Sequence, residues 1–170
     1  YFLSYVLGVR TNRDPGGDLE LPPTVRGFIV HQVLDRFCRA MLEDPDLATA
    51  SDTDRWHLGA TARQRLLDMA TEIADDAAAA GLAGTPLLWE RDRQRLMDDF
   101  LAFPDHDAAR PWRGVIRGSE LSFGTTSLND NPVQRILPSG RTVQFRGSID
   151  RLEQRSDGSL VVLDYKTGAP

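Results

Sequence analysis

The sequence predicts an α+β (α/β) fold in which helices come first and a sheet follows. Between residues 24 and 113, apolar residues recur at three- and four-residue spacing, as they do on one face of a helix. From Gly114 onward, short runs that alternate apolar and polar residues are separated by turn-forming segments, which is typical of antiparallel strands. With 170 residues, of which 41% are hydrophobic, the chain can bury one core.

The first expected helix begins at Thr24, a suitable N-cap, and extends to about Leu42. His31 lies on or beside its apolar face. That face is marked by Phe28, Leu34, Phe37 or Cys38, and Met41. Taken alone, a histidine in this position is more often a hydrogen-bonded core residue than a metal ligand. The downstream Asp150 and Asp164 favour the ligand instead.

Two further helical patterns, over residues 52–80 and 86–103, separate the first helix from the sheet. His57 and His106 fall near them, without acidic residues at ligand spacing on a shared apolar face, so we expect both at the surface. We interpret residues 43–113 as a helical insertion that takes no part in catalysis.

The sheet is expected to consist of strands joined by turns rich in Gly, Pro and Asn. The order is strand 114–123, turn 129–132, turn 138–141, strand 143–152 and strand 160–165. Glu120 is the only acidic residue of the first strand.

The last strand delivers an acid and a base at its end. Alternation along a strand puts Asp164 and Lys166 on one face, about 7 Å apart. Lys166 is the only lysine among 20 basic residues. Arginine is a planar, permanently charged fork, whereas lysine is a compact ammonium that fits beside a small nucleophile. Chance placement of one lysine is the alternative to a specific role.

A second carboxylate, Asp150, arrives from the preceding strand, and the turn between the strands decides whether the two acids meet. A two-residue turn at 157–158 would put Asp150 and Asp164 on opposite faces. A three-residue loop, 156–158 with Gly158 in the left-handed position, pairs them directly. Opposed carboxylates repel each other, and a divalent cation removes that repulsion. We therefore favour the three-residue loop.

Three motifs in this order carry a resemblance to a known family. They are Gly-x-x-x-His at 27–31, Gly-x-x-Asp-Arg at 147–151 and Leu-Asp-Tyr-Lys-Thr-Gly at 163–168. Together they resemble the RecB branch of the PD-(D/E)xK nuclease superfamily. The resemblance implies a restriction-endonuclease-like core with a mostly antiparallel or mixed sheet flanked by helices.

The resemblance also implies the residues of a metal site. In such nucleases the histidine, the two acids and a carbonyl bind Mg²⁺ or Mn²⁺, which implies His31, Asp150, Asp164 and the Tyr165 carbonyl as ligands. Lys166 would lie next to the attacking water, so that Asp150, Asp164 and Lys166 are the expected catalytic residues.

Two residues beside this site have more than one interpretation. The family often carries an acid in the first strand, so Glu120 is either an outer-shell ligand or an exposed strand residue. Some relatives hold an iron–sulfur cluster, which needs four thiolates. Cys38 is the only cysteine, and we expect it to be a small buried apolar residue.

The function implied by the resemblance is metal-dependent, exonuclease-type hydrolysis of DNA. Expected partners are linear and single-stranded DNA, a helicase domain in the same parent chain and a second helicase–nuclease subunit. A DNA repair or recombination helicase of the UvrD or Adn type is the expected parent. The alternative is a catalytically silent nuclease fold that binds or guides single-stranded DNA for a partner subunit. The presence of His31, Asp150, Asp164 and Lys166 favours the enzyme.

Composition sets the remaining limits. The net charge of −5 argues against a generally basic nucleic-acid binder, although a local arginine cluster could still contact phosphates. We expect most arginines to pair with the abundant Asp and Glu on solvated helix faces. Nothing resembles a membrane span or signal peptide, so a cytoplasmic location is expected.

The chain begins on Tyr1 and ends at Pro170, so we expect a single nuclease domain over 1–170, truncated at both ends. Its expected parts are the N-terminal helices 1–42, the insertion 43–113 and the catalytic sheet 114–170. The family continues past the lysine motif into a further helix, so the isolated fragment is expected to hold a ligand set without a complete active site.

Overall fold

The computed structural model describes residues 21–44, 60–112, 114–124 and 132–167. The described residues form three helices and five strands, which confirms the α+β prediction. The helices are α1 (Pro23–Glu43), α3 (Ala60–Ala79) and α4 (Pro86–Ala108), and the strands are β1 (Val115–Phe123), β2 (Val133–Ile136), β3 (Thr142–Phe145), β4 (Gly147–Gln154) and β5 (Leu160–Leu163). The expectations for residues 1–20, for His57 and for the start of the second helical pattern lie outside these residues. No described helix is long and apolar enough to cross a membrane.

Helix α1 begins slightly earlier than the sequence predicts. Its N-cap is Pro22, and no side chain caps it, so the prediction of Thr24 as the cap was wrong. The N–H groups of Val25 and Arg26 donate to the Pro22 carbonyl at 2.9 and 3.0 Å. Proline at the first helical position suits a helix start because its φ is preset and its missing N–H would have no partner in the helix.

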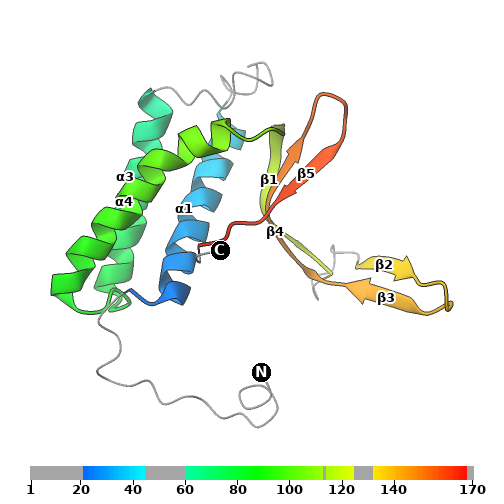
Figure 1. Cartoon of the computed structure of the whole chain (residues 1–170), viewed down its shortest axis with the longest axis horizontal. Coiled ribbons are helices and arrows are strands. Elements are labelled where there is room, and N and C mark those ends of the chain that lie inside the picture. The colour runs from blue at the N-terminus through cyan, green and yellow to red at the C-terminus, as the bar shows by residue number, and fades with distance from the viewer. Residues whose placement is uncertain (1–20, 45–59, 113, 125–131, 168–170) are drawn as a thin grey trace, which may run out of the picture.

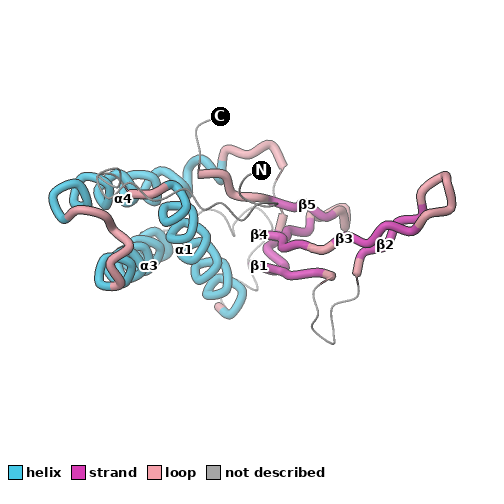
Figure 2. The backbone as a smooth tube through the Cα atoms, turned by 90° about the horizontal axis from the view of Figure 1, so that it is seen from below, coloured by secondary structure: helices cyan, strands magenta, loops and turns pink. Residues whose placement is uncertain are grey.

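The core lies around α1. Figures 1 and 2 show α1 between the other two helices and the sheet. The buried side chains of α1 are Ile29, Val33, Leu34, Phe37, Cys38 and Met41, and they pack on Leu66, Ala70, Ile73 and Ala77 of α3, Leu96 and Phe100 of α4, and Ile116 of β1. Helices α3 and α4 therefore bury the apolar face of the helix that carries His31. Cys38 is buried and His106 is exposed, both as predicted.

Helix α4 continues past the point where the sequence predicts its end. The expected boundary at Phe103 was wrong, because the helix passes through Pro104 and ends at Ala108. Proline inside a helix removes a backbone hydrogen bond and costs about 3 kcal/mol. Beyond Pro104 the helix forms two ion pairs, an exposed one between Asp105 and Arg63 of α3 and a buried one between Asp107 and Arg151 of β4.

The main sheet has the order β1-β4-β5 with antiparallel pairing, and β2 and β3 form a separate hairpin. The single strand expected over 143–152 was wrong, because it divides at Arg146 into β3, which pairs with β2, and β4, which pairs with β1. Gly124 makes the corner possible. It has φ +67°, and a Cβ there would lie 2.4 Å from the Phe145 carbonyl oxygen.

The β4–β5 connection is the three-residue loop that the sequence predicts. Gly158 has φ +83°, and its N–H donates to the Arg155 carbonyl at 2.9 Å. The resulting register pairs Arg151 with Leu163. It brings Asp150 and Asp164, the next residue on each side, to the same end of this hairpin. Strand β5 ends at Leu163, two residues earlier than expected.

Candidate metal centre

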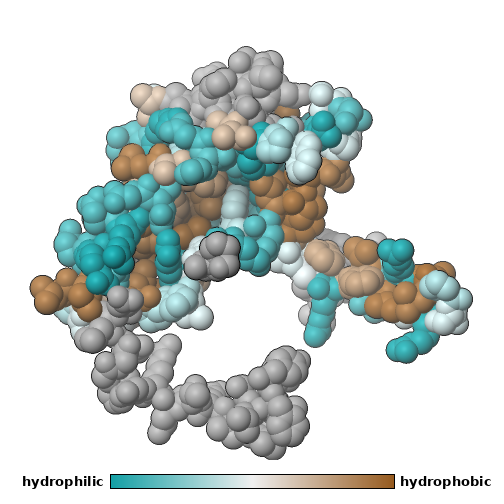
Figure 3. Space-filling view, in the orientation of Figure 1, coloured by the Kyte–Doolittle hydropathy of each residue, from teal (hydrophilic) through white to brown (hydrophobic). Residues whose placement is uncertain are grey.

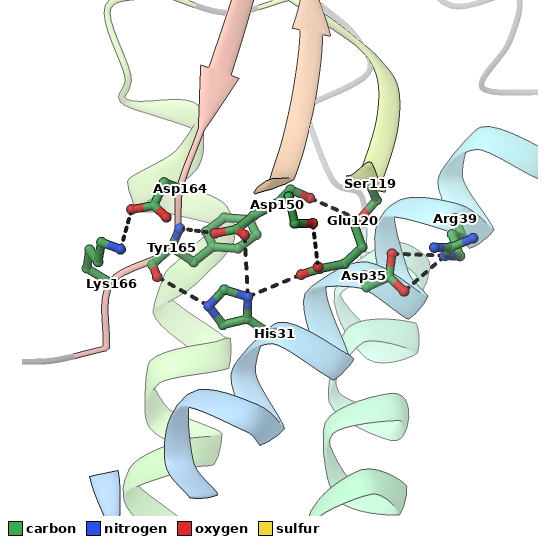
Figure 4. Close-up of polar contacts among 10 residues, drawn as sticks. His31, Asp35, Arg39, Ser119, Glu120, Asp150, Asp164, Tyr165 and Lys166 are labelled. Atoms are coloured by element: carbon green, nitrogen blue, oxygen red, sulfur yellow. Dashed lines mark hydrogen bonds and ion pairs between the residues drawn. The ribbon is translucent and has the colours of Figure 1, made fainter. Parts of the chain in front are cut away.

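Three donor side chains from three separate elements meet where α1 faces the sheet. His31 comes from α1, Glu120 from β1 and Asp150 from β4, and their ligand atoms all lie within 4.8 Å of one another. His31 Nδ1 lies 3.2 Å from Glu120 Oε1 and 3.6 Å from Asp150 Oδ1 (Figure 4). The fold thus gathers an imidazole and two carboxylates that are far apart in the sequence.

Asp150 is the most firmly held of the three. Its side chain is 9% exposed, and Oδ2 accepts a hydrogen bond from the Tyr165 N–H at 2.6 Å. The hydroxyl of Ser119 donates to the Asp150 carbonyl at 3.2 Å. Because β1 and the segment after β5 both bind this residue, its second oxygen is fixed toward His31.

Glu120 has the only left-handed non-glycine backbone among the described residues, with φ +46°. Such a conformation costs about 1–3 kcal/mol and persists where neighbouring contacts enforce it. Here the Ser148 hydroxyl donates to Glu120 Oε2 at 3.3 Å, while Oε1 faces His31. The side chain is 33% exposed, and it lies within the donor cluster rather than outside it.

Tyr165 presents its backbone to the site and its ring to the core. Its carbonyl oxygen lies 3.3 Å from His31 Nε2, and its ring meets the His31 ring edge to face at 5.9 Å. The Arg151 guanidinium lies 5.7 Å from the ring centroid on the core side. Burial raises the pKa of the Tyr165 hydroxyl. The anchored ring therefore holds the carbonyl beside the imidazole.

Asp164 and Lys166 lie apart from this cluster. Lys166 Nζ contacts Asp164 Oδ2 at 2.6 Å, with 79% and 59% of the two side chains exposed. The hydrogen bond that Lys166 donates to the Asp164 carboxylate raises the pKa of Lys166. The two side chains contact each other, but strand alternation is not the reason, because β5 ends at Leu163 and neither residue lies in a strand. The structure brings Asp150 to His31 but does not bring Asp164 there, because the chain leaves the sheet after Leu163 and the Asp164 carboxylate turns to Lys166 (Figure 4).

A buried ionic network braces the strand that carries Asp150. Arg151 Nη2 lies 2.5 Å from Asp107 Oδ1 and 3.0 Å from Glu153 Oε1. Arg110 Nη2 donates to the same Glu153 oxygen at 2.8 Å, and the Gly114 N–H donates to Glu153 Oε2 at 3.1 Å. The network joins the end of α4 to β4 and to the start of β1. It carries no sequence signal beyond the arginine of the Gly-x-x-Asp-Arg motif.

The cluster opens to solvent on one side. A hollow of about 330 Å³ is lined by Phe28, His31, Gln32, Asp35 and Glu120. Asp35 is engaged elsewhere, since it accepts two hydrogen bonds from Arg39 Nε at 2.9 Å. A ligand that enters the hollow therefore meets the imidazole and the Glu120 carboxylate first.

The donor set fits a divalent cation. Two carboxylates within 4.8 Å of a shared imidazole concentrate negative charge that a cation neutralises. Carboxylate and carbonyl oxygens suit Mg²⁺ and Mn²⁺, and the imidazole nitrogen suits Mn²⁺ better than Mg²⁺. The sequence left Glu120 open between an outer-shell ligand and an exposed strand residue. Glu120 belongs to the donor cluster because of the β1–β4 register. Ser119 pairs with Arg151 and Leu121 with Ile149, which places Glu120 opposite Asp150.

Comparison with known proteins agrees with this geometry. Residues 1–170 match the model of the PD-(D/E)XK nuclease superfamily. The chain is also similar to one component of the ATP-dependent helicase/deoxyribonuclease of Streptococcus mutans serotype c, with 34% identity over 74 residues, which are 39% of this chain and 7% of that protein. The chain thus matches only a small part of the length of this curated relative. Since the family model covers every residue, this chain belongs to the PD-(D/E)XK nuclease superfamily.

Proposed function

We propose that this chain is a Mg²⁺- or Mn²⁺-dependent deoxyribonuclease that hydrolyses DNA phosphodiester bonds as a module of a repair or recombination helicase–nuclease. The observation that carries the proposal is the cluster of His31, Glu120 and Asp150. The family match supports the nucleolytic chemistry. The name of the similar Streptococcus protein supports a helicase as the partner, in the same parent chain or in a second protein of the complex.

In this proposal Asp150, Glu120 and Nδ1 of His31 hold the ion. The Tyr165 carbonyl, which the resemblance implies as a further ligand, instead faces Nε2 of the same ring and orients the imidazole. When bound, a divalent cation supplies positive charge to the phosphate and makes water a better nucleophile. Asp150 and Tyr165 act as a pair, because the peptide of Tyr165 donates its N–H to the acid and presents its carbonyl to His31.

Asp164 and Lys166 act from the rim. The Lys166 ammonium orients the attacking water and offsets the negative charge that builds on the phosphate. Asp164 serves as a further ligand when its ion pair with Lys166 opens. That opening is accessible because both side chains are mostly exposed and exposed ion pairs are weak.

Calorimetric titration of the chain with Mn²⁺ tests the ligand set without depending on activity. Asp150→Asn should abolish binding, because it removes the most buried carboxylate of the cluster. Asp35→Asn is the matched control, since Asp35 lines the same hollow but is bound to Arg39. Equal affinity in the two variants would contradict the metal assignment.

Cleavage of linear DNA separates the enzyme from a silent scaffold. Asp150→Ala and Asp164→Ala should each abolish cleavage and retain DNA binding, because a carboxylate that repels phosphate is removed. If either variant still cleaves DNA, catalysis does not require both Asp150 and Asp164, and this part of the proposal is wrong. The test uses the parent protein, because the chain alone is expected to lack a complete active site. A parent protein that binds Mn²⁺ and DNA but cuts in no divalent ion would support the scaffold function instead.

A further inference from the structure

Most of the described arginines outside the β2–β3 hairpin are paired with acids. Every arginine on α1, α3 and α4 has a carboxylate within 3.9 Å. Arg151, Arg110 and Arg155 pair with acids as well. Arg117 of β1 donates instead to the side-chain oxygen of Gln154 at 3.0 Å. The helical surface thus neutralises its own positive charge, as the sequence predicts, and offers little to a phosphate backbone.

The hairpin differs from the rest of the chain. Residues 132–147, which we call the hairpin arm, contain β2, β3, Arg135, Arg141 and Arg146, and no Asp or Glu. All three arginines are exposed, and no carboxylate pairs with any of them within the described ranges. In a chain of net charge −5, this arm is therefore a segment of local charge +3.

The arm also exposes apolar side chains beside these charges. Val133, Ile136 and Phe145 are 54%, 73% and 47% exposed. Figure 3 shows the arm projecting from the rest of the chain, with hydrophobic and hydrophilic side chains adjacent on its surface. Such an array of arginine and aromatic groups, without acids, is complementary to a polyanion that also carries flat apolar rings.

A hollow at the base of the arm brings these two properties together. It measures about 700 Å³ and is lined by Leu121, Phe123, Ile149, Val133, Phe145 and Arg135, with two polar neighbours. Val133 pairs with Phe145 across the hairpin, and Arg135 pairs with Val143. Alternation puts Phe145, Val133 and Arg135 on one face. The guanidinium thus lies beside an apolar surface large enough to receive a nucleobase.

We propose that the hairpin arm binds single-stranded DNA, with Arg135, Arg141 and Arg146 on the phosphates and the bases against Phe145 and the hollow. The inference rests on the proposed nuclease function and names the surface that presents the strand to it. Stacked, paired bases in a duplex hide their faces, whereas single strands expose them to aromatic side chains. Arg146 precedes Asp150 by four residues, about 13 Å along a strand, so one DNA strand can contact both.

Fluorescence anisotropy of a labelled oligothymidylate, in EDTA and at several salt concentrations, tests this surface. The triple variant Arg135→Gln, Arg141→Gln, Arg146→Gln should bind on the order of tenfold more weakly or worse. Its plot of log affinity against log salt should be shallower by about 2, because three single-strand phosphate contacts each contribute about 0.7. Phe145→Leu keeps the apolar bulk and should weaken binding about fivefold or more through lost stacking.

The control removes the same charge from the helices. The triple variant Arg36→Gln, Arg63→Gln, Arg93→Gln also lowers the net charge by three, but each of these arginines is bound to an acid. It should leave the salt slope unchanged. Arm arginines replaced by lysine should restore the slope, which excludes misfolding as the cause.

The outcome is independent of cleavage, because EDTA removes divalent ions. Loss of binding in the arm variants of a protein that never cuts would sustain this inference while the nuclease proposal fails. Unchanged affinity and slope in the arm variants would overturn it, even if the chain cleaves DNA. The exposed apolar residues of the arm would then be assigned to a protein partner.

Discussion

Replacing Glu153 by glutamine should destabilise the fold far more than the same change at Glu72. Both acids form an ion pair in which an arginine nitrogen lies 2.8 Å from a carboxylate oxygen, so the two distances are alike. The Glu153 side chain is 0% exposed, whereas the Glu72 side chain is 56% exposed. The two variants therefore compare a carboxylate in a buried ionic network with a carboxylate in a single exposed ion pair.

The magnitude follows from what the Glu153 carboxylate satisfies. It accepts hydrogen bonds from Arg110 and from the Gly114 N–H and forms an ion pair with Arg151. An amide in its place offers only one oxygen and turns an N–H toward the other donors. Breaking a buried pair costs about 3–5 kcal/mol, because the remaining charge is buried without full compensation. An exposed pair such as Arg36–Glu72 contributes about 0–1 kcal/mol.

Urea denaturation of the chain, followed by circular dichroism, measures the difference. With an m value of about 2 kcal/mol/M, the midpoint should fall by roughly 1.5–2.5 M for Glu153→Gln and by at most about 0.5 M for Glu72→Gln. The m value should stay the same in both variants. Equal midpoint shifts would refute the view that the Arg151 network holds β4 to α4.

Three further substitutions test other parts of the structure. Glu120→Gly should relieve about 1–2 kcal/mol of left-handed backbone strain, whereas the added chain entropy of glycine in the unfolded state should cost about 0.5–1 kcal/mol. Calorimetry should therefore show an unchanged or higher melting temperature together with loss of Mn²⁺ binding. A lower melting temperature would contradict the strain. Burial by itself would raise the pKa of Asp92, but hydrogen bonds from Leu21 and Arg91 hold it below the ordinary 3.8. Because the pKa of Asp92 is lower in the folded state, its contribution to stability is present above pH 3.8 and is lost as the pH falls through the folded-state pKa. In urea titrations at a series of pH values, Asp92→Asn should therefore reduce the loss of unfolding free energy at low pH. An unchanged loss would contradict the lowered pKa of Asp92. Lys166→Arg should slow single-turnover DNA cleavage by roughly 10²-fold, because a wider cation misplaces the attacking water; wild-type cleavage by this variant would remove the special role of Lys166.

Local signals predicted much of the fold. Helical periodicity located three helices. The three-residue loop that sets the β4–β5 register was favoured because it pairs Asp150 with Asp164, and Gly158 has the left-handed backbone that this loop requires. The predictions that were wrong concern element boundaries that depend on contacts between residues far apart in the sequence. The passage of α4 through Pro104 depends on Asp107 meeting Arg151, and the break at Arg146 depends on the corner at Gly124.

The candidate site likewise contains residues that the sequence motifs predict and residues whose positions depend on distant contacts. The motifs themselves single out His31 and Asp150, and the structure brings them together. The position of Glu120 depends on how β1 aligns with β4 across the hairpin arm, and no short motif specifies that alignment. The Asp164 carboxylate can contact either Lys166 or the donor cluster of His31, Glu120 and Asp150. Strand alternation does not determine which of these it contacts.

The three donors belong to different layers of the molecule, with His31 on a helix and Glu120 and Asp150 on the sheet. No layer alone contains a site, so the site exists only when α1 is docked on β1 and β4. Under the proposed function, the free energy with which α1 docks on the sheet therefore depends on the concentration of divalent ions. At a hundredfold excess over the dissociation constant, binding would add about 2.7 kcal/mol to the free energy of unfolding. Amide hydrogens at the α1–sheet interface should then exchange more slowly with solvent when Mn²⁺ is present, which would report ion occupancy without any DNA.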